Sequence, residues 1–463
     1  MTIIHDQAMQ YIHQQVLERL LSHMSQAQRA SLQLLIQRLL VAAGGPEYIG
    51  TFRLLVVHGG DRRSARLLAI LRAAQLSIAL RAPVTFQLRV LVVCLPAASA
   101  ALLEQHERGF NALFLHDDPR VQLQMVEAGA VAPFNRRPTS AAAHWAQARD
   151  ALLLFGHLVD ARPDALLGSR LHLELADSVR LALGDQPCAD ALVTAMPLRQ
   201  RRRYLVWARR ALRLAGLVGP SNEHACMATL AERLGQLHGT AGSPHAAAGE
   251  IGQQPACEIP MRLMAIDDLL PQLLSEGELD LMMGWRFEPA QESMPLAAFL
   301  DPLALAQLHD LRSRCRALSG RRQALRLVSQ RAASKPPVPQ LPRFAKAYGI
   351  DQTQLICLLY SPFAEQGRGL ERFLQCSHAD MLVALPYLHR ALQGKPCPEA
   401  VKHWLVNTSG LALTQLRAIY EGRLQHSVRR FLASLARRDV HLAFLPRHKG
   451  ASIVACGAPA DGA

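Results

Sequence analysis

Aromatic and charged residues are scarce in this sequence. Aromatic side chains make up 5% of its 463 residues and charged side chains 19%, whereas half of the residues are hydrophobic. A core with so few aromatic rings must be built mainly from Leu, Ala, Val and Ile, and because Leu and Ala are strong helix formers, this composition favours packed helices. It also argues against intrinsic disorder over most of the chain, since disorder requires low hydrophobicity.

Clustered cysteines are missing as well. The nine cysteines are spread along the chain, and no two of them stand in a CxxC spacing. Zinc sites and disulfide frameworks normally bring cysteines together in the sequence, so we expect neither here. Reduced thiols of this kind indicate a reducing compartment.

Long hydrophobic runs and a secretory signal are also lacking. The most apolar stretches, Leu88–Pro96 and Ala151–Leu158, are far shorter than the ~20 residues that a membrane-spanning helix needs. The first residues lack the basic region and the apolar region that mark a secretory signal. We therefore expect a cytoplasmic protein without a membrane span.

Catalytic motifs are absent too. The sequence contains no GxSxG, HExxH, GxGxxG or P-loop motif. Two polar segments come nearest to a ligand site: the backbone amides of His58–Arg63 at a helix start suit an anion, and the carboxylates of His116–Asp118 suit Mg²⁺. A helix cap and a surface loop explain these segments more simply. The sequence therefore predicts no enzymatic activity, no cofactor and no metal.

Positive charge is what the sequence has in excess. The formal net charge is +14 and the sequence pI is about 9.8. An excess of this size favours polyanionic partners, namely nucleic acid, an anionic membrane surface or an acidic protein. The alternative is a coding bias toward Arg, with no functional meaning.

Hydrophobic periodicity and breaks rich in Gly or Pro divide the chain into six parts. These are an N-terminal helical segment (1–46), a small α/β domain (50–135), a helical domain (140–237), a flexible linker (238–258), an Arg-rich helical segment (259–334) and a C-terminal helical domain (343–450). The fold class predicted is mostly α and multidomain, with a small α/β unit of parallel strands and helices near the N-terminus.

Local patterns give finer expectations for the first half of the chain. Residues 5–43 show helical spacing and predict one long helix or a helical pair, ended by Gly44-Gly45-Pro46. Strands are expected at 53–58, 88–95 and 111–116, with helices between them. Asp118 before Pro119 has the residue types of a helix start, so a helix is expected from Pro119. The segment 140–237 is expected to be helical throughout.

A segment beyond a proline-rich stretch resembles the helix-turn-helix family of DNA-binding units. The family places a small residue in the first helix, a Gly at the turn and apolar anchors after it. The matching positions are Ala345, Gly349, Ile350, Leu355 and Leu358.

A second match follows, with Gly410, Leu411, Leu416 and Ile419 at the corresponding positions. Val406 departs from the family's small residue, which puts a tight helix crossing in doubt. The resemblance implies that the second helix of each unit reads base edges. The side chains that would do so are Gln352, Thr353, Gln354, Thr414, Gln415 and Arg417. The alternative is two ordinary helix corners in a helical domain.

A basic helix is expected at 198–216, with seven Arg residues and with Tyr204 and Trp207 between them. Phosphate contact, with aromatic stacking as an option, is the functional interpretation. The residues expected to make this contact are Arg201, Arg202, Arg209 and Arg210. The alternative is a solvated face whose aliphatic stems cover apolar surface.

These patterns favour a non-enzymatic DNA-binding protein with a regulatory or plasmid-maintenance type of role. The competing hypothesis is an intracellular adaptor or assembly protein, for example a cytosolic component of a secretion system, whose basic helices meet acidic protein partners. A homo-oligomer is compatible with both hypotheses. The two differ in geometry, because DNA binding needs a continuous exposed basic surface and an adaptor needs an exposed apolar patch.

Overall fold

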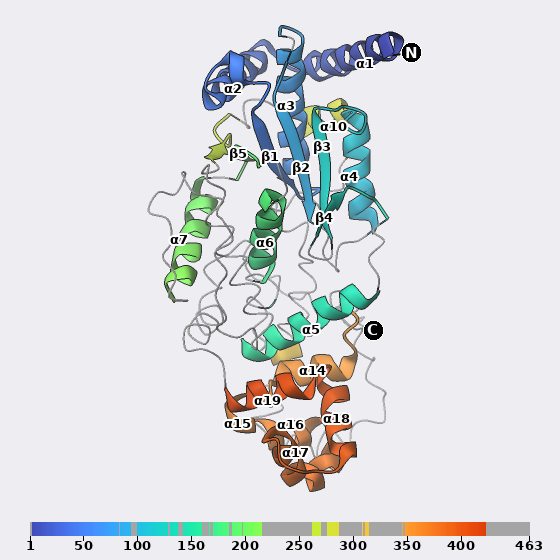
Figure 1. Cartoon of the computed structure of the whole chain (residues 1–463), viewed down its shortest axis with the longest axis vertical. Coiled ribbons are helices and arrows are strands. Elements are labelled where there is room, and N and C mark those ends of the chain that lie inside the picture. The colour runs from blue at the N-terminus through green and yellow to red at the C-terminus, as the bar shows by residue number, and fades with distance from the viewer. Residues whose placement is uncertain are drawn as a thin grey trace, which may run out of the picture.

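The chain is predominantly helical and contains one mixed six-stranded sheet, as the computed structural model shows (Figure 1). The structure describes residues 2–82, 84–93, 100–127, 130–137, 142–159, 166, 170–184, 188–196, 198–214, 262–269, 276–286, 308, 311–313, 345 and 348–422. The expected linker at 238–258 and the proline-rich stretch at 335–342 lie outside these residues. The sheet lies toward one end of the long axis, and the C-terminal helices lie toward the other.

Two helices open the chain, α1 (Thr2–Ser22) and α2 (Gln26–Ala43). Ser25 starts α2 with a capping box: its hydroxyl accepts from the Gln28 amide, and the Gln28 side chain accepts from the Ser25 amide. Gly44, at φ 94°, ends α2 in the left-handed conformation. The prediction of a helical pair that ends at the Gly-Gly-Pro segment is therefore confirmed.

The strands are β1 (Arg53–His58), β2 (Gln87–Val93), β3 (Val121–Glu127), β4 (Ala130–Pro133), β5 (Ala191–Thr194) and β6 (Arg262–Ala265). Their order is β4-β3-β2-β1-β5-β6, and only the β3–β4 pair is antiparallel. Strands β2, β3 and β4 lie on one side of β1, and β5 and β6, which come later in the chain, lie on its other side. This reversal is the switch point of a doubly wound sheet.

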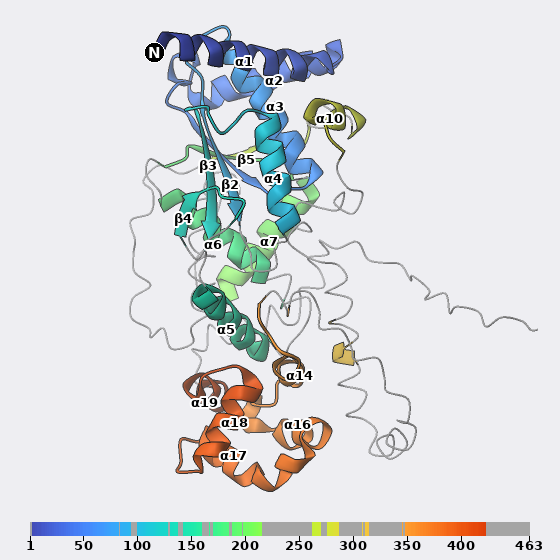
Figure 2. The ribbon, with the colours of Figure 1, turned by 90° about the vertical axis from the view of Figure 1, so that its right-hand side faces the viewer.

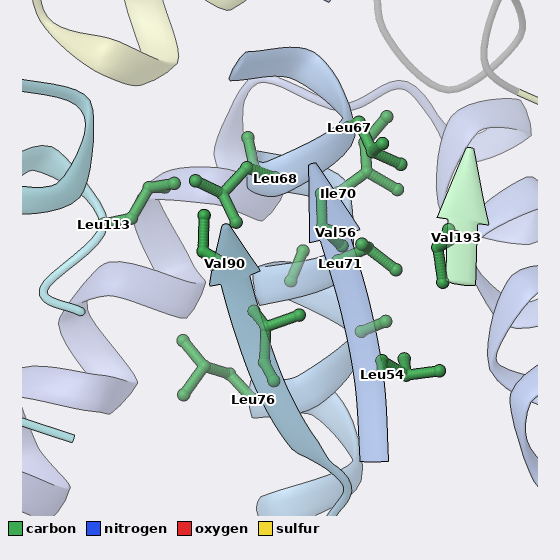
Figure 3. Close-up of a cluster of buried hydrophobic side chains, with 14 of the residues drawn as sticks. Leu54, Val56, Leu67, Leu68, Ile70, Leu71, Leu76, Val90, Leu113 and Val193 are labelled. Carbon is green, nitrogen blue, oxygen red and sulfur yellow. The ribbon is translucent and has the colours of Figure 1, made fainter. Parts of the chain in front are cut away.

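Successive side chains of β1 point to opposite faces of the sheet, and apolar ones are buried on both faces. Both faces are therefore covered by helices. Leu54 and Val56 pack against α3 (Arg62–Ala79), and Figure 3 shows them with Leu68 and Leu71 in one apolar cluster. Leu55, on the opposite face, belongs to a second cluster that includes residues of α6 (Arg170–Gly184). Helices α4 (Ala100–Ala112) and α10 (Glu276–Met283) add residues to the first cluster.

The third strand differs from the prediction. Residues 111–116 do not form it, because α4 continues to Ala112, and the third strand is Val121–Glu127. No helix begins at Pro119 either. Asp118 is buried and accepts hydrogen bonds from Arg72 and Arg120. The prediction followed the apolar run before Asp118, whereas the actual strand alternates polar Gln with apolar residues.

The sheet also extends beyond the expected α/β domain at 50–135. Strand β5 lies within 140–237, so that segment is not helical throughout, and β6 lies at 262–265. Each has four residues, which is too short for a periodic signal. Pairing with β1 supplies the hydrogen bonds that make β5 a strand.

The C-terminal body combines α5 (Ala142–Leu158) with later helices (Figure 2). They are α14 (Gln352–Tyr360), α15 (Ala364–Gly367), α16 (Leu370–Ser377), η4 (Ala379–Ala384), α17 (Leu385–Leu392), α18 (Glu399–Ser409) and α19 (Leu413–Glu421). Gly156 allows the close approach of α5 and α14, since a Cβ there would come within 2.4 Å of the Leu358 side chain.

Candidate nucleic-acid interface

Helix α7 (Leu198–Leu214) presents a basic stripe to solvent. Arg201, Leu205 and Ala208 are buried and define its inner face. The exposed positions on the outer face are Arg199, Arg202, Val206, Arg210 and Arg213. Because successive residues turn by about 100° around a helix, these five positions fall within a sector of roughly 80°. We call them the α7 stripe.

The α7 stripe is not neutralised by the residues that the structure describes. The helix contains seven Arg and no Asp or Glu. Within the described part of the chain, no hydrogen bond or ion pair reaches the side chains of Arg199, Arg202, Arg210 or Arg213. A guanidinium stays charged at any physiological pH and can bind a phosphate with two parallel hydrogen bonds. The α7 stripe therefore offers, on one face, four cations that no described residue pairs.

Arg201 has a different role from its neighbour Arg202. Its guanidinium forms an ion pair with Asp267, just after β6, and donates to the Met196 carbonyl oxygen at 2.6 Å. The Asp267 carboxylate also accepts from the Leu198 amide at 3.1 Å. These contacts fix the start of α7 against the sheet and occupy Arg201 within the protein.

The four arginines predicted for phosphate contact are thus placed in different surroundings. Arg202 and Arg210 are exposed, Arg209 is half-buried and interacts within the protein, and Arg201 is buried. Arg199 and Arg213 are exposed as well, although they were not among the four residues predicted to contact phosphate. Helical spacing alone could have found them, since both fall on the same face as Arg202 and Arg210.

At the first predicted helix corner, the structure describes Ala345 and the residues from Tyr348 onward. Gly349 adopts φ 66°, and the Ile350 amide donates to the Ala345 carbonyl oxygen at 2.8 Å. Asp351 caps α14 and exchanges hydrogen bonds with Gln354. Gln352 and Thr353 are exposed, whereas Gln354 is half-buried. Of the three residues predicted to read bases here, only Gln352 and Thr353, in the first turn of α14, are therefore exposed to solvent.

The second corner turns at Gly410, which has φ 72° and donates to the Val406 carbonyl oxygen at 2.8 Å. Thr414 is exposed, but Gln415 accepts from the Ala412 amide at 3.1 Å. Arg417 donates to the Ala391 carbonyl oxygen at 3.0 Å, at the end of α17. Gln415 and Arg417 are thus held within the protein, and Thr414 also has an interaction there.

Acidic and basic side chains are balanced in the segment that contains both turns. Residues 348–422 carry six acidic and six basic side chains. Helix α14 packs against α5 and α18, and α19 packs against α5, α15, α17 and α18. A helix that enters the major groove needs a free face and a positive potential around it. The described corners have an exposed first turn but no excess of positive charge.

The carboxyl edge of the sheet is where ligands bind in many doubly wound folds. Here Asp61 caps α3, so a carboxylate of the protein occupies the helix start at which an anion was considered. Arg62 is paired with Asp280. Asp267 occupies the start of α7 in the same way. The amide groups at the starts of α3 and α7, the helices that follow β1 and β5, are therefore bound by carboxylates of the protein itself.

Two buried histidines complete this edge. The His58 Nδ1 atom lies 2.7 Å from His106 Nδ1 and accepts from the Gly60 amide at 3.3 Å. The hydrogen between the two rings therefore belongs to His106. Burial lowers the pKa of His58 to about 3 and the pKa of His106 well below its ordinary value, so both rings are neutral at pH 7. A Cβ at Gly60 would meet Leu102 and His106, which leaves little space above β1.

The carboxylates of His116–Asp118 are not arranged for Mg²⁺. Asp118 is bound by Arg72 and Arg120, and these guanidinium groups hold its pKa well below the usual range despite its burial. Over the described part of the chain, no group of three or more His, Cys, Asp or Glu side chains is arranged to hold a metal ion. No described helix has the length and apolar character needed to cross a membrane.

Comparisons with protein-family models, with curated proteins and with solved structures found no match to this chain.

Proposed function

We propose that this protein binds DNA without catalysing a reaction, and that the α7 stripe makes the main contact with the phosphate backbone. The role is of a regulatory or plasmid-maintenance type. The observation that carries the proposal is the set of four exposed arginines on one face of a helix without any acidic residue. The α/β part and the C-terminal helical part are proposed to be separate domains, with the helix corners serving mainly as architecture of the second.

Counterion release is the physical basis of this contact. Each phosphate that a cation neutralises on duplex DNA lowers the slope of log K against log[salt] by about 0.9. Four contacts would give a slope of about −3.6, and affinity would then fall ~150-fold between roughly 50 and 200 mM salt. Phosphate contacts carry no base information, so this binding would be almost independent of sequence.

The test is fluorescence anisotropy on the full chain, with a salt titration on a labelled duplex. Replacing Arg199, Arg202, Arg210 and Arg213 by Gln should remove about 3.6 from the salt slope. The matched control replaces four exposed cations of the C-terminal body by Gln, namely Arg368, Arg372, Arg390 and Lys395. It removes the same charge and should leave most of the slope.

Two results would contradict the proposal. The first is a wild-type protein that does not bind duplex DNA at roughly 50 mM salt. The second is an equal loss of slope in the α7 variant and in the control, which would mean that net charge alone decides binding. Thermal melts followed by circular dichroism would check that both variants fold.

The adaptor hypothesis is supported by a different observation. Leu34 and Val41 are seven residues apart on α2 and are both exposed, at 57% and 76%, and Tyr48 is exposed near Gly44. Exposed apolar side chains close together are typical of a protein-binding surface. If this surface is the functional one, replacing Leu34 and Val41 by Ser would weaken the binding of a protein partner. The α7 variant would leave that binding unchanged.

A further inference from the structure

The charge of α7 is concentrated at its two ends. Arg199 and Arg202 lie near its start, and Arg210 and Arg213 lie near its end. Residues 204–208 between them carry no charge. At the centre of the α7 stripe lies Val206, which is 62% exposed. The stripe is therefore two pairs of cations with an apolar gap, and not a uniform basic line.

The separation of the two pairs follows from helix geometry. Their midpoints are about 11 residues apart, which corresponds to about 16–17 Å at a rise of 1.5 Å per residue. Both pairs point to the same side. A rigid helix thus holds two cation pairs at a fixed distance, facing one surface.

A B-form duplex presents phosphates at such a distance across its major groove. The groove is about 12 Å wide between its rims, and the phosphate groups on each side add several ångströms to the separation of their centres. The minor groove, at about 6 Å, is too narrow for both pairs to lie on opposite rims. A single strand offers no second rim at all.

We infer that α7 lies across the major groove of a B-form duplex. Arg199 and Arg202 contact the phosphates of one rim, Arg210 and Arg213 contact those of the other, and Val206 faces the groove between them. This inference rests on the proposed function and adds the form of the nucleic acid and the orientation of the helix. It also explains why the middle of the stripe is apolar, since no phosphate lies beneath it.

The experiment compares three DNA probes of equal length by anisotropy at one salt concentration. They are a plain duplex, the same duplex with glucosylated 5-hydroxymethylcytosine in place of cytosine, and one of its single strands. Glucosylation fills the major groove and leaves the phosphate charge unchanged. We expect at least ~10-fold weaker binding to the glucosylated duplex and to the single strand.

Two paired variants test the two rims separately. Arg199→Gln with Arg202→Gln, and Arg210→Gln with Arg213→Gln, should each remove about half of the salt slope on the plain duplex, about 1.8. On the single strand, where one rim is missing, the two variants should differ from the wild type by less.

The outcomes separate the inference from the proposed function. Equal binding to the plain and glucosylated duplexes, or binding to the single strand as tight as to the duplex, would overturn the groove-crossing geometry and leave phosphate binding intact. Failure to bind any of the three probes would overturn both.

Discussion

The exposed arginines of α7 and Arg417 of α19 lie in different surroundings. Arg202 and Arg210 point to solvent from a helix without acidic residues, whereas Arg417 donates to the Ala391 carbonyl oxygen near the end of α17. A cation near a helix end completes that helix, because carbonyl groups there have no partner of their own. A cation on an outward stripe stays available for an external anion. Exposure and partners, and not residue type, distinguish a binding arginine from a structural one.

The largest effect is expected from acid, which should destabilise the C-terminal body through His157 and leave the charge of α7 unchanged. Burial holds the pKa of His157 at about 4, below the value of 6.5 in the unfolded chain. Between these values the unfolded chain binds a proton that the folded chain excludes, so the free energy of unfolding falls as the pH drops from 6.5 toward 4, by up to about 3 kcal/mol. The arginines of α7 keep their charge throughout this window.

Urea unfolding at pH 7.5 and pH 5 would measure this effect. His157→Leu should reduce the loss of stability between the two pH values, and His403→Asn, at an exposed position, should not. The salt slope of DNA binding should be the same at pH 7.5 and pH 6. Identical pH dependence in the wild type and in His157→Leu would contradict the assignment.

The two corner glycines should differ in their tolerance of a side chain. Gly410→Ala should cost about 2–3 kcal/mol, because the residue has φ 72° and its Cβ would lie 2.7 Å from Leu153 and 2.9 Å from Gln354. Gly349→Ala, at φ 66° with no atom of the described residues beyond its chain neighbours within 4 Å, should cost about 1 kcal/mol from backbone strain alone. Chemical denaturation would compare them, and an equal loss would mean that the second corner is not tightly packed.

Arg201 and Arg202 are adjacent in the chain, but their substitution should have different effects. One should lower stability, and the other should lower the salt slope of DNA binding. Arg201→Gln breaks a largely buried ion pair and should destabilise the protein by about 2 kcal/mol, with the salt slope unchanged. Arg202→Gln should leave stability within about 0.5 kcal/mol and reduce the slope by about 0.9. Thermal melts and anisotropy on both variants would check this. A swap of the two phenotypes would mean that Arg202, and not Arg201, lies on the side of α7 that faces the protein.

The smallest effect is expected at the corners. Replacing Gln352, Thr353 and Thr414 together by Ala should change DNA affinity by less than about 2-fold, since no phosphate contact is lost, and should not alter any preference between sequences. Competition with duplexes of different sequence would detect such a preference. A loss of discrimination of ~10-fold or more would restore the recognition-helix hypothesis, because one base contact is worth about 1–3 kcal/mol.

Local patterns predicted the parts of the fold that depend on local sequence. The break after Ala43, the strand at 53–58 and the left-handed glycines Gly349 and Gly410 all follow from residue types within a few positions. Strands β5 and β6 could not be found in this way, because their pairing partners are distant in the chain. The alternation of Gln with apolar residues in β3 was visible, but the more hydrophobic run before it misled the prediction.

The candidate site was predicted in part. The sequence pointed to the basic helix and to Arg202 and Arg210, which are exposed. It could not show that Arg201 would be buried, because Asp267 is 66 residues away in the chain. The same limit applies to Arg417, whose acceptor belongs to another helix. Which of several equivalent cations stays free depends on tertiary contacts.

The close approach of α5 and α14 at Gly156 has a consequence during synthesis. Helix α5 ends at Leu158 and α14 begins at Gln352, so roughly 190 residues must be translated before α5 meets its partner. At about 5–20 residues per second this takes about 10–40 s. During that time the apolar side of α5 that carries Leu152, Leu153 and Phe155 has no C-terminal body to cover it. The nascent chain therefore passes through a long interval in which chaperone binding or misassociation competes with completion of the core.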